Sequence, residues 1–153
     1  MELDETALKI LNKLGDGRAS FQKIADSLTL SEGTVRNRIH SMVNSGILEI
    51  RGQVDLEALD GYNMVQIGIK LSTMDLVGKG EEISHLPSVL NVLVVTGRFD
   101  LMATVLLRKG KTLADFYLNE MNKIEQIQGV ETFVVYKEFN TKIPCNAIEV
   151  NNE

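Results

Sequence analysis

The sequence predicts an α+β protein, with a helix-turn-helix domain of the winged type followed by a ferredoxin-like βαββαβ domain. The first observation is a pair of short amphipathic segments, residues 21–28 and 32–45, separated by only three residues. Such a short connection fits a tight turn between two helices. The second is a change of periodicity from residue 63 onward, where hydrophobic patterns follow the order strand, helix, strand, strand, helix, strand.

The N-terminal part is expected to hold three helices and one strand, within a domain spanning residues 1–54. Hydrophobic residues recur at helical spacing between Leu3 and Leu14, and the run stops at residues 15–17, Gly-Asp-Gly. The two amphipathic segments then supply the second and third helices. Gly46 follows the third helix where a left-handed cap is favoured, and residues 47–54 are predicted to form a strand.

The C-terminal part is expected to begin after a hinge at residues 55–62 and to span residues 63–138. Strands are predicted at 63–72, 89–96, 101–107 and 130–136, with helices from about Gly78 to the residue before Pro87 and over 112–127, ended by Gly129. Helices would cover one face of this sheet only, so we expect homodimerisation through the other face. The tail, residues 139–153, is predicted to be either a strap or a frayed end.

The third helix sorts its residues by direction at about 100° per residue. Val35, Ile39, Met42 and Val43 make an apolar stripe. The residues opposite are small or form hydrogen bonds, as contacts to base edges in a major groove require: Gly33, Thr34, Asn37, His40 and Ser41.

Basic side chains and a helix cap complete the predicted DNA surface. Arg36 and Arg38 flank the polar face, where phosphate strands would run. Ser31 is placed to cap the helix N-terminus, an end that also suits a phosphate. Arg18, before the second helix, and Arg51, on the predicted wing strand, are candidates for phosphate contacts, with internal ion pairs as the equal alternative. We therefore predict binding to double-stranded DNA.

Composition bounds the other possibilities. The net charge of −5 belongs entirely to residues 53–153, because residues 1–52 carry as many acidic as basic side chains. A neutral head binds DNA modestly as one copy, so tight binding is expected to need a dimer or more. One cysteine and two distant histidines predict no disulfide, metal or other cofactor. No apolar run approaches the roughly 20 residues that span a bilayer, and the N-terminus is acidic, so we expect a cytoplasmic protein without a membrane partner.

Short motifs in order along the chain resemble the Lrp/AsnC (leucine-responsive, feast/famine) transcription regulators. They are Leu3-Asp4, Asp16-Gly17-Arg18, Ile24-Ala25, Leu30-Ser31, Val35 with Arg38-Ile39, Gly46-Ile47-Leu48, the 55–59 linker and the 96–100 turn. The resemblance covers nearly the whole chain. It implies a regulator that dimerises, assembles into tetramers or octamers and binds a small effector, often an amino acid, between dimers.

The resemblance also implies an effector loop at Thr96, Gly97, Arg98, Phe99 and Asp100. Gly97 would permit close backbone approach, Arg98 would pair with a carboxylate and Asp100 with an amino group; an ordinary hairpin turn is the alternative. Thr132 is carried over from the family's last strand, although the approach to that strand is shorter here. Arg98-Phe99 also departs from the usual family context, so the effector would differ from a simple neutral amino acid or be absent.

Two alternatives accompany this interpretation. Siroheme-decarboxylase-like enzymes resemble these regulators in both domains, but the second half of this chain offers only His85 and scattered basic residues for tetrapyrrole carboxylates. We therefore expect no enzymatic activity and assign no catalytic residue. The other alternative is an architectural DNA binder that responds to no effector.

Overall fold

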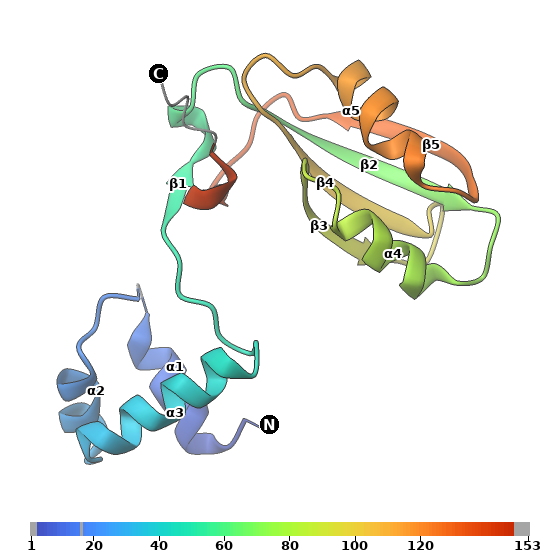
Figure 1. Ribbon diagram of the computed structural model, residues 1–153. Helices are drawn as coiled ribbons and strands as arrows, with labels where there is room; N and C mark the ends of the chain where they lie inside the picture. The colour runs from blue at the N-terminus through green and yellow to red at the C-terminus, as the bar shows by residue number, and fades with distance from the viewer. Residues whose placement is uncertain (1–2, 16, 149–153) are drawn as a thin grey trace. The chain divides into compact units, whose positions relative to one another are not determined.

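The computed structural model describes residues 3–15 and 17–148 (Figure 1). The chain divides into two compact units, residues 1–52 and 53–153. Each unit has its own hydrophobic core, and each is considered by itself below. Asp16, part of the predicted stop after the first helix, and residues 149–153 of the predicted tail lie outside the described residues.

The first unit contains three helices, α1 (Glu5–Leu14), α2 (Phe21–Leu28) and α3 (Glu32–Asn44). Each begins at a side chain that accepts a hydrogen bond from a free backbone N–H of the first turn, namely Asp4, Ser20 and Ser31. Thr29 adopts a left-handed conformation (φ 57°) and ends α2, which lets the chain reverse within three residues. The predicted helix-turn-helix is confirmed.

The predicted wing strand over residues 47–54 is wrong. Gly46 is left-handed (φ 70°), as expected of a cap, and the N–H groups of Ile47 and Leu48 both donate to the Met42 carbonyl at 3.0 and 3.1 Å. Residues 47–52 form no strand. The strand β1 covers only Gln53–Asp55, where a partner strand from the C-terminal segment is available.

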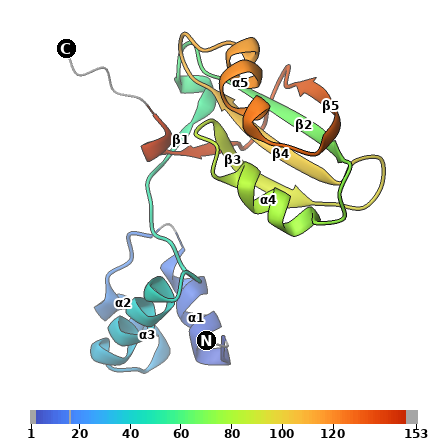
Figure 2. The ribbon, with the colours of Figure 1, turned by 45° about the vertical axis from the view of Figure 1, so that its right-hand side comes forward.

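The second unit is built on a four-stranded antiparallel sheet in the order β3-β4-β2-β5 (Figure 2). In chain order its elements are β2 (Asn63–Leu71), α4 (Leu76–Ser84), β3 (Val89–Val94), β4 (Leu101–Leu107), α5 (Leu113–Asn119), the 3₁₀ turn η2 (Met121–Lys123) and β5 (Ile127–Val134). The first and third strands of this series are central, and the second and fourth lie at the edges. This is the predicted βαββαβ topology.

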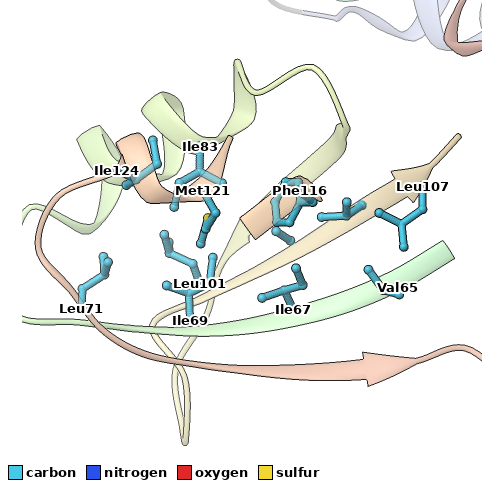
Figure 3. Packing of buried hydrophobic residues seen from close by; sticks show 12 residues of the cluster. Val65, Ile67, Ile69, Leu71, Ile83, Leu101, Leu107, Phe116, Met121 and Ile124 are labelled. Carbon is cyan, nitrogen blue, oxygen red and sulfur yellow. The ribbon is translucent and has the colours of Figure 1, made fainter. Parts of the chain in front are cut away.

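The core of the second unit lies between the sheet and its two helices. Alternate residues of β2 (Val65, Ile67, Ile69 and Leu71) are buried and point toward Ile83 of α4 and Phe116 of α5, as Figure 3 shows. Both helices therefore cover the same face. The period of two along β2 is what places these side chains together.

Two helix boundaries differ from the prediction. Helix α4 begins at Leu76 and not near Gly78, because the Asp75 side chain caps it by accepting from the Gly78 N–H at 3.0 Å. Helix α5 ends at Asn119, and Gly129, the predicted stop, lies inside β5 opposite Lys70. After α5 the chain forms the turn η2, Gln126 adopts a left-handed conformation (φ 65°), and β5 begins at Ile127, opposite Leu71 of β2.

The C-terminal segment covers part of the other face of the sheet. Strand β6 (Lys142–Pro144) pairs antiparallel with β1, followed by the 3₁₀ turn η3 (Cys145–Ala147); Figures 1 and 2 show this segment beside β1. Ile143 is fully buried in a small third cluster with Leu56 of the turn η1 (Leu56–Ala58) and Leu106 of β4. Of the two predicted forms of the tail, the described part is the strap.

Candidate DNA surface and effector loop

Helix α3 separates its buried and outer sides as the sequence indicates. Val35, Ile39 and Met42 are at most 1% exposed, and the side opposite carries the exposed residues Gly33, Thr34, Asn37, His40 and Ser41. Ser31 accepts from the Thr34 N–H at 3.0 Å and so caps the helix. Val43 departs from the prediction: it is 42% exposed, because it lies at the edge of the apolar stripe.

Both arginines of α3 form ion pairs within the first unit. Arg36 pairs with Glu32 one turn earlier on the same helix. Arg38 instead reaches α1, where its Nη1 donates to both carboxylate oxygens of Asp4 at 2.8 Å. The pKa of Asp4 is lowered by the backbone N–H of Ala7 and by Arg38. Sequence reasoning placed Arg38 facing phosphate and missed Asp4, since the pairing depends on how α1 packs on α3.

The remaining DNA candidates lie around α2 and the end of the first unit. His40 meets Phe21, the first residue of α2, edge to face at 6.4 Å between ring centroids. Arg18 is exposed just before α2. Arg51 pairs with Glu49 and does not lie on a wing strand, because residues 47–52 form none.

The predicted effector loop connects β3 and β4, and Asp100 anchors it. One oxygen of Asp100 accepts from the Lys70 ammonium at 2.7 Å and the other from the Leu71 N–H at 2.9 Å. The Asp100 N–H also donates to the Ile69 carbonyl at 2.9 Å. The Leu71 N–H and the Lys70 ammonium hold the pKa of Asp100 below its usual range. Lys70 thus occupies the position expected for an effector amino group.

Arg98 and Phe99 are tied to neighbouring strands. Arg98 forms an ion pair with Glu131 of β5 at 2.5 Å. The Phe99 ring lies over Gly68 of β2, so close that a Cβ at position 68 would come within 2.6 Å of ring carbons. Phe99 also meets Phe133 edge to face at 5.9 Å between centroids. Thr96 and Gly97 form the exposed tip of the loop, with Gly97 at φ 130°.

Thr132 does not join the effector loop within one chain. It pairs with Ile67 on the helix-covered side of the sheet and is 2.7 Å from the Tyr117 hydroxyl of α5. Phe99 lies over Gly68, whose position in the strand faces the opposite side. Sequence reasoning also missed Lys70, Glu131 and Tyr117. The alternation of β2 and β5 would place Lys70 and Glu131 on one face, but only once the strand register is known.

Neither a metal cluster nor a membrane-spanning helix is found in the described part of the chain. Residues 3–15 and 17–148 contain no group of three or more His, Cys, Asp or Glu side chains arranged to hold a metal ion. None of the helices in these ranges is long and apolar enough to cross a bilayer.

The chain matches two family descriptions in the order of its two units. Residues 3–43 match the AsnC-type helix-turn-helix domain. Residues 64–143, about half of the chain, match the Lrp/AsnC ligand binding domain. The chain belongs to the Lrp/AsnC family. It is therefore a DNA-binding transcription regulator and not an enzyme.

Relatives agree with this assignment over most of their length. An HTH-type transcriptional regulator of Pyrococcus abyssi is 30% identical over 135 residues, 88% of this chain and 84% of that protein. LrpA of Pyrococcus horikoshii is 31% identical over 84% of this chain and 91% of its own.

Solved structures of the family share the fold. AsnC of E. coli superposes with a TM-score of 0.68 at 25% identity, covering 90% of this chain and 95% of that one. A regulator from Neisseria meningitidis, solved as a complex with L-methionine, gives a TM-score of 0.69 at 20% identity, over 92% and 94% of the two chains.

Proposed function

We propose that this Lrp/AsnC regulator reads DNA with the outer face of α3, as a homo-oligomer whose assembly responds to a small amino-acid-like effector in the cytoplasm. In this scheme residues 1–54 read DNA, 55–62 act as a hinge and 63–138 bind the effector and oligomerise, while the described part of the 139–153 tail, through β6, straps the hinge. The observation that carries the proposal is the carboxylate-free outer face of a capped helix within a helix-turn-helix.

The uncovered part of the sheet is the proposed dimer surface. On this face lie Leu93, Met102 and Phe133, and the Phe133 ring meets Phe99 edge to face; Leu93 is 58% and Phe133 41% exposed. Exposed apolar side chains gathered on one face of a sheet favour burial of that face against a second copy of the chain. Between them the Thr104 hydroxyl accepts a hydrogen bond from the Gln66 side-chain amide N–H at 3.0 Å and donates to the Asn91 side-chain carbonyl at 3.1 Å, so these polar groups have partners before the surface is covered.

Dimerisation would supply the DNA affinity that a single copy of the electrically neutral first unit lacks. Two copies would place two α3 helices in successive major grooves, and a pseudo-palindromic operator would mirror the two-fold axis. Tetramers or octamers would bring further pairs onto one DNA. An effector bound between copies biases the assembly state, and through it the number of heads that bind together.

The effector proposal rests on the ligand-binding domain match and on the loop at 96–100. Arg98 and Asp100 carry the charges that complement a zwitterionic amino acid, although both are paired internally, with Glu131 and Lys70. A ligand must therefore exchange with these partners. The L-methionine complex of the Neisseria meningitidis regulator makes L-methionine a reasonable first probe.

Substitutions on α3 test the DNA surface. Arg36→Ala should weaken binding to all sequences and lower the slope of log K against log salt by about one, because one phosphate contact is lost. Asn37→Ala should relax sequence preference at one base pair, by about 1–3 kcal/mol. Both are measured by mobility-shift titration on a fragment selected from random DNA by the wild-type protein. Lys13→Ala, a matched loss of one exposed charge on α1, is the control.

If neither α3 variant changes affinity or preference, α3 is not the reading helix.

The effector is tested separately, by thermal-shift and sedimentation measurements with L-methionine and the other amino acids. A ligand that stabilises the protein and changes its assembly supports the proposal. Failure of all of them to change either quantity would favour an architectural DNA binder without an effector.

A further inference from the structure

Asp4 joins the N-terminus of α1 to the middle of α3. Its Oδ1 accepts from the Ala7 N–H at 2.7 Å and so caps α1. The same carboxylate receives both hydrogen bonds from Arg38 Nη1. The two residues lie 34 positions apart in the sequence, so this single contact reports the packing of two helices and not a local turn.

Arg38 lies at the boundary between the buried and outer sides of α3. At about 100° per residue it sits roughly 60–80° from the centre of the buried stripe, on the same flank as Thr34 one turn before and Ser41 one turn after. Its side chain is 37% exposed. Arg36, on the other flank, pairs within its own helix, so only Arg38 is held by a group that belongs to another element.

A guanidinium has five N–H donors in a rigid plane, so an arginine held through Nη1 still has the valence to meet a second acceptor. A carboxylate that fixes the plane removes rotamer freedom before DNA arrives, which lowers the cost of ordering the side chain on binding. We propose that Asp4 is a positioning residue for DNA binding: it holds Arg38 so that another N–H edge of the guanidinium donates to the phosphate backbone. This rests on the proposed role of α3 as the reading helix.

A positioning role for Asp4 and simple electrostatics predict opposite changes in DNA affinity when the charge of Asp4 is removed. A carboxylate near DNA repels phosphate, so removing its charge should tighten binding if charge alone matters. If Asp4 positions Arg38, the same removal should weaken binding. Asp4→Asn separates the two effects because asparagine caps a helix as well as aspartate does, leaving the α1 cap in place while the ion pair is lost.

The experiment compares four variants with wild type on the DNA fragment selected from a random pool. They are Asp4→Asn, Arg38→Ala, the double variant, and Glu5→Gln as control; Glu5 is the next residue, exposed, and paired with Lys9 at 2.7 Å. Asp4→Asn should weaken binding about three- to tenfold, the effect of one side chain that must be ordered on binding. Glu5→Gln should leave affinity unchanged or slightly raised. The double variant should bind no more weakly than Arg38→Ala.

Salt titrations and thermal unfolding complete the test. For Asp4→Asn the slope of log K against log salt should become shallower, by up to about 0.9, the value of one phosphate contact. A purely structural loss would lower the melting temperature and leave this slope unchanged for the folded protein. An Asp4→Asn variant that binds as tightly as wild type or tighter, or that weakens Arg38→Ala further, overturns the inference. If Arg36→Ala and Arg38→Ala both bind normally, the role of α3 itself fails.

Discussion

At the scale of single residues, the charged groups expected to meet ligands are already paired inside the chain. Arg38 has Asp4, Arg98 has Glu131 and Asp100 has Lys70. The sequence shows which residues are charged but not which opposite charge each of them meets, because each of these partners comes from another element. If these residues bind DNA and an effector as proposed, each ligand must share or exchange the internal partner, and the affinity of each site depends on the strength of the internal pair.

Asp100 should make stability depend on pH in the acid range. Its pKa is lowered from 3.8 by the Leu71 N–H and then by Lys70, so its contribution is fully present above about pH 3.8 and is lost as pH falls through the lower native pKa. Asp100→Asn should be less stable than wild type at pH 7. The difference in urea midpoint should stay constant from pH 7 to about 5 and shrink below about pH 3.8; a difference that ignores pH would contradict the ion pair.

At the scale of elements, close approach between the 96–100 loop and β2 depends on the absence of a side chain at Gly68. The ring of Phe99 occupies the space over Gly68 where any other residue would place its Cβ. This lets the loop lie on the sheet and carries Arg98 toward Glu131. The sequence marks Gly68 only as a small residue in a strand.

Gly68→Ala should force Phe99 off the sheet. The added Cβ would lie 2.6 Å from two ring carbons, so we expect a loss of about 1–3 kcal/mol in unfolding free energy, typical of overpacking. The control is Gly129→Ala on the adjacent strand, where a Cβ would meet nothing within 4 Å. Combining Gly68→Ala with Phe99→Ala should cost less than the two changes summed. Equal costs for the two glycine variants in urea denaturation would be against this packing.

At the scale of the whole molecule, the first strand of the second unit, β1, pairs with its last strand, β6. Strand β1 follows directly after the first unit and pairs with β6 near the end of the chain. Ion pairs from Lys142 to Asp55 and from Lys137 to Glu57 add to the buried contact of Ile143 with Leu56. The segment that follows the first unit is thus fastened to the sheet by the C-terminal segment.

Ile143→Ala should loosen this fastening. Ile143 is fully buried, and truncating such a side chain costs about 2–5 kcal/mol, which chemical denaturation of the second unit would measure. Limited proteolysis should cut faster near residues 53–60, because β1 loses its partner. Val134→Ala, at a side chain 75% exposed, should change neither quantity. A protease-resistant linker in the Ile143 variant would mean that β6 does not hold β1.

Much of the fold was predictable because its causes are local. The three capped helices, the tight turn at Thr29 and the alternation of β2 follow from hydrophobic spacing and capping side chains within a few residues of each other. The identity of the outer face of α3 follows in the same way. Each of these features depends on neighbours in the chain, so the sequence by itself determined them.

Tertiary structure decided what depends on distant partners. Strand β1 is three residues long and not a wing, because only Gln53–Asp55 find β6; β5 extends back to Ile127 because β2 offers hydrogen bonds there. Arg38 turns toward Asp4 for the same reason, since helix packing brings a carboxylate within reach. Strand pairing, strand register and ion pairs between elements join groups that lie far apart in the chain. They contribute to stability only once the elements have packed.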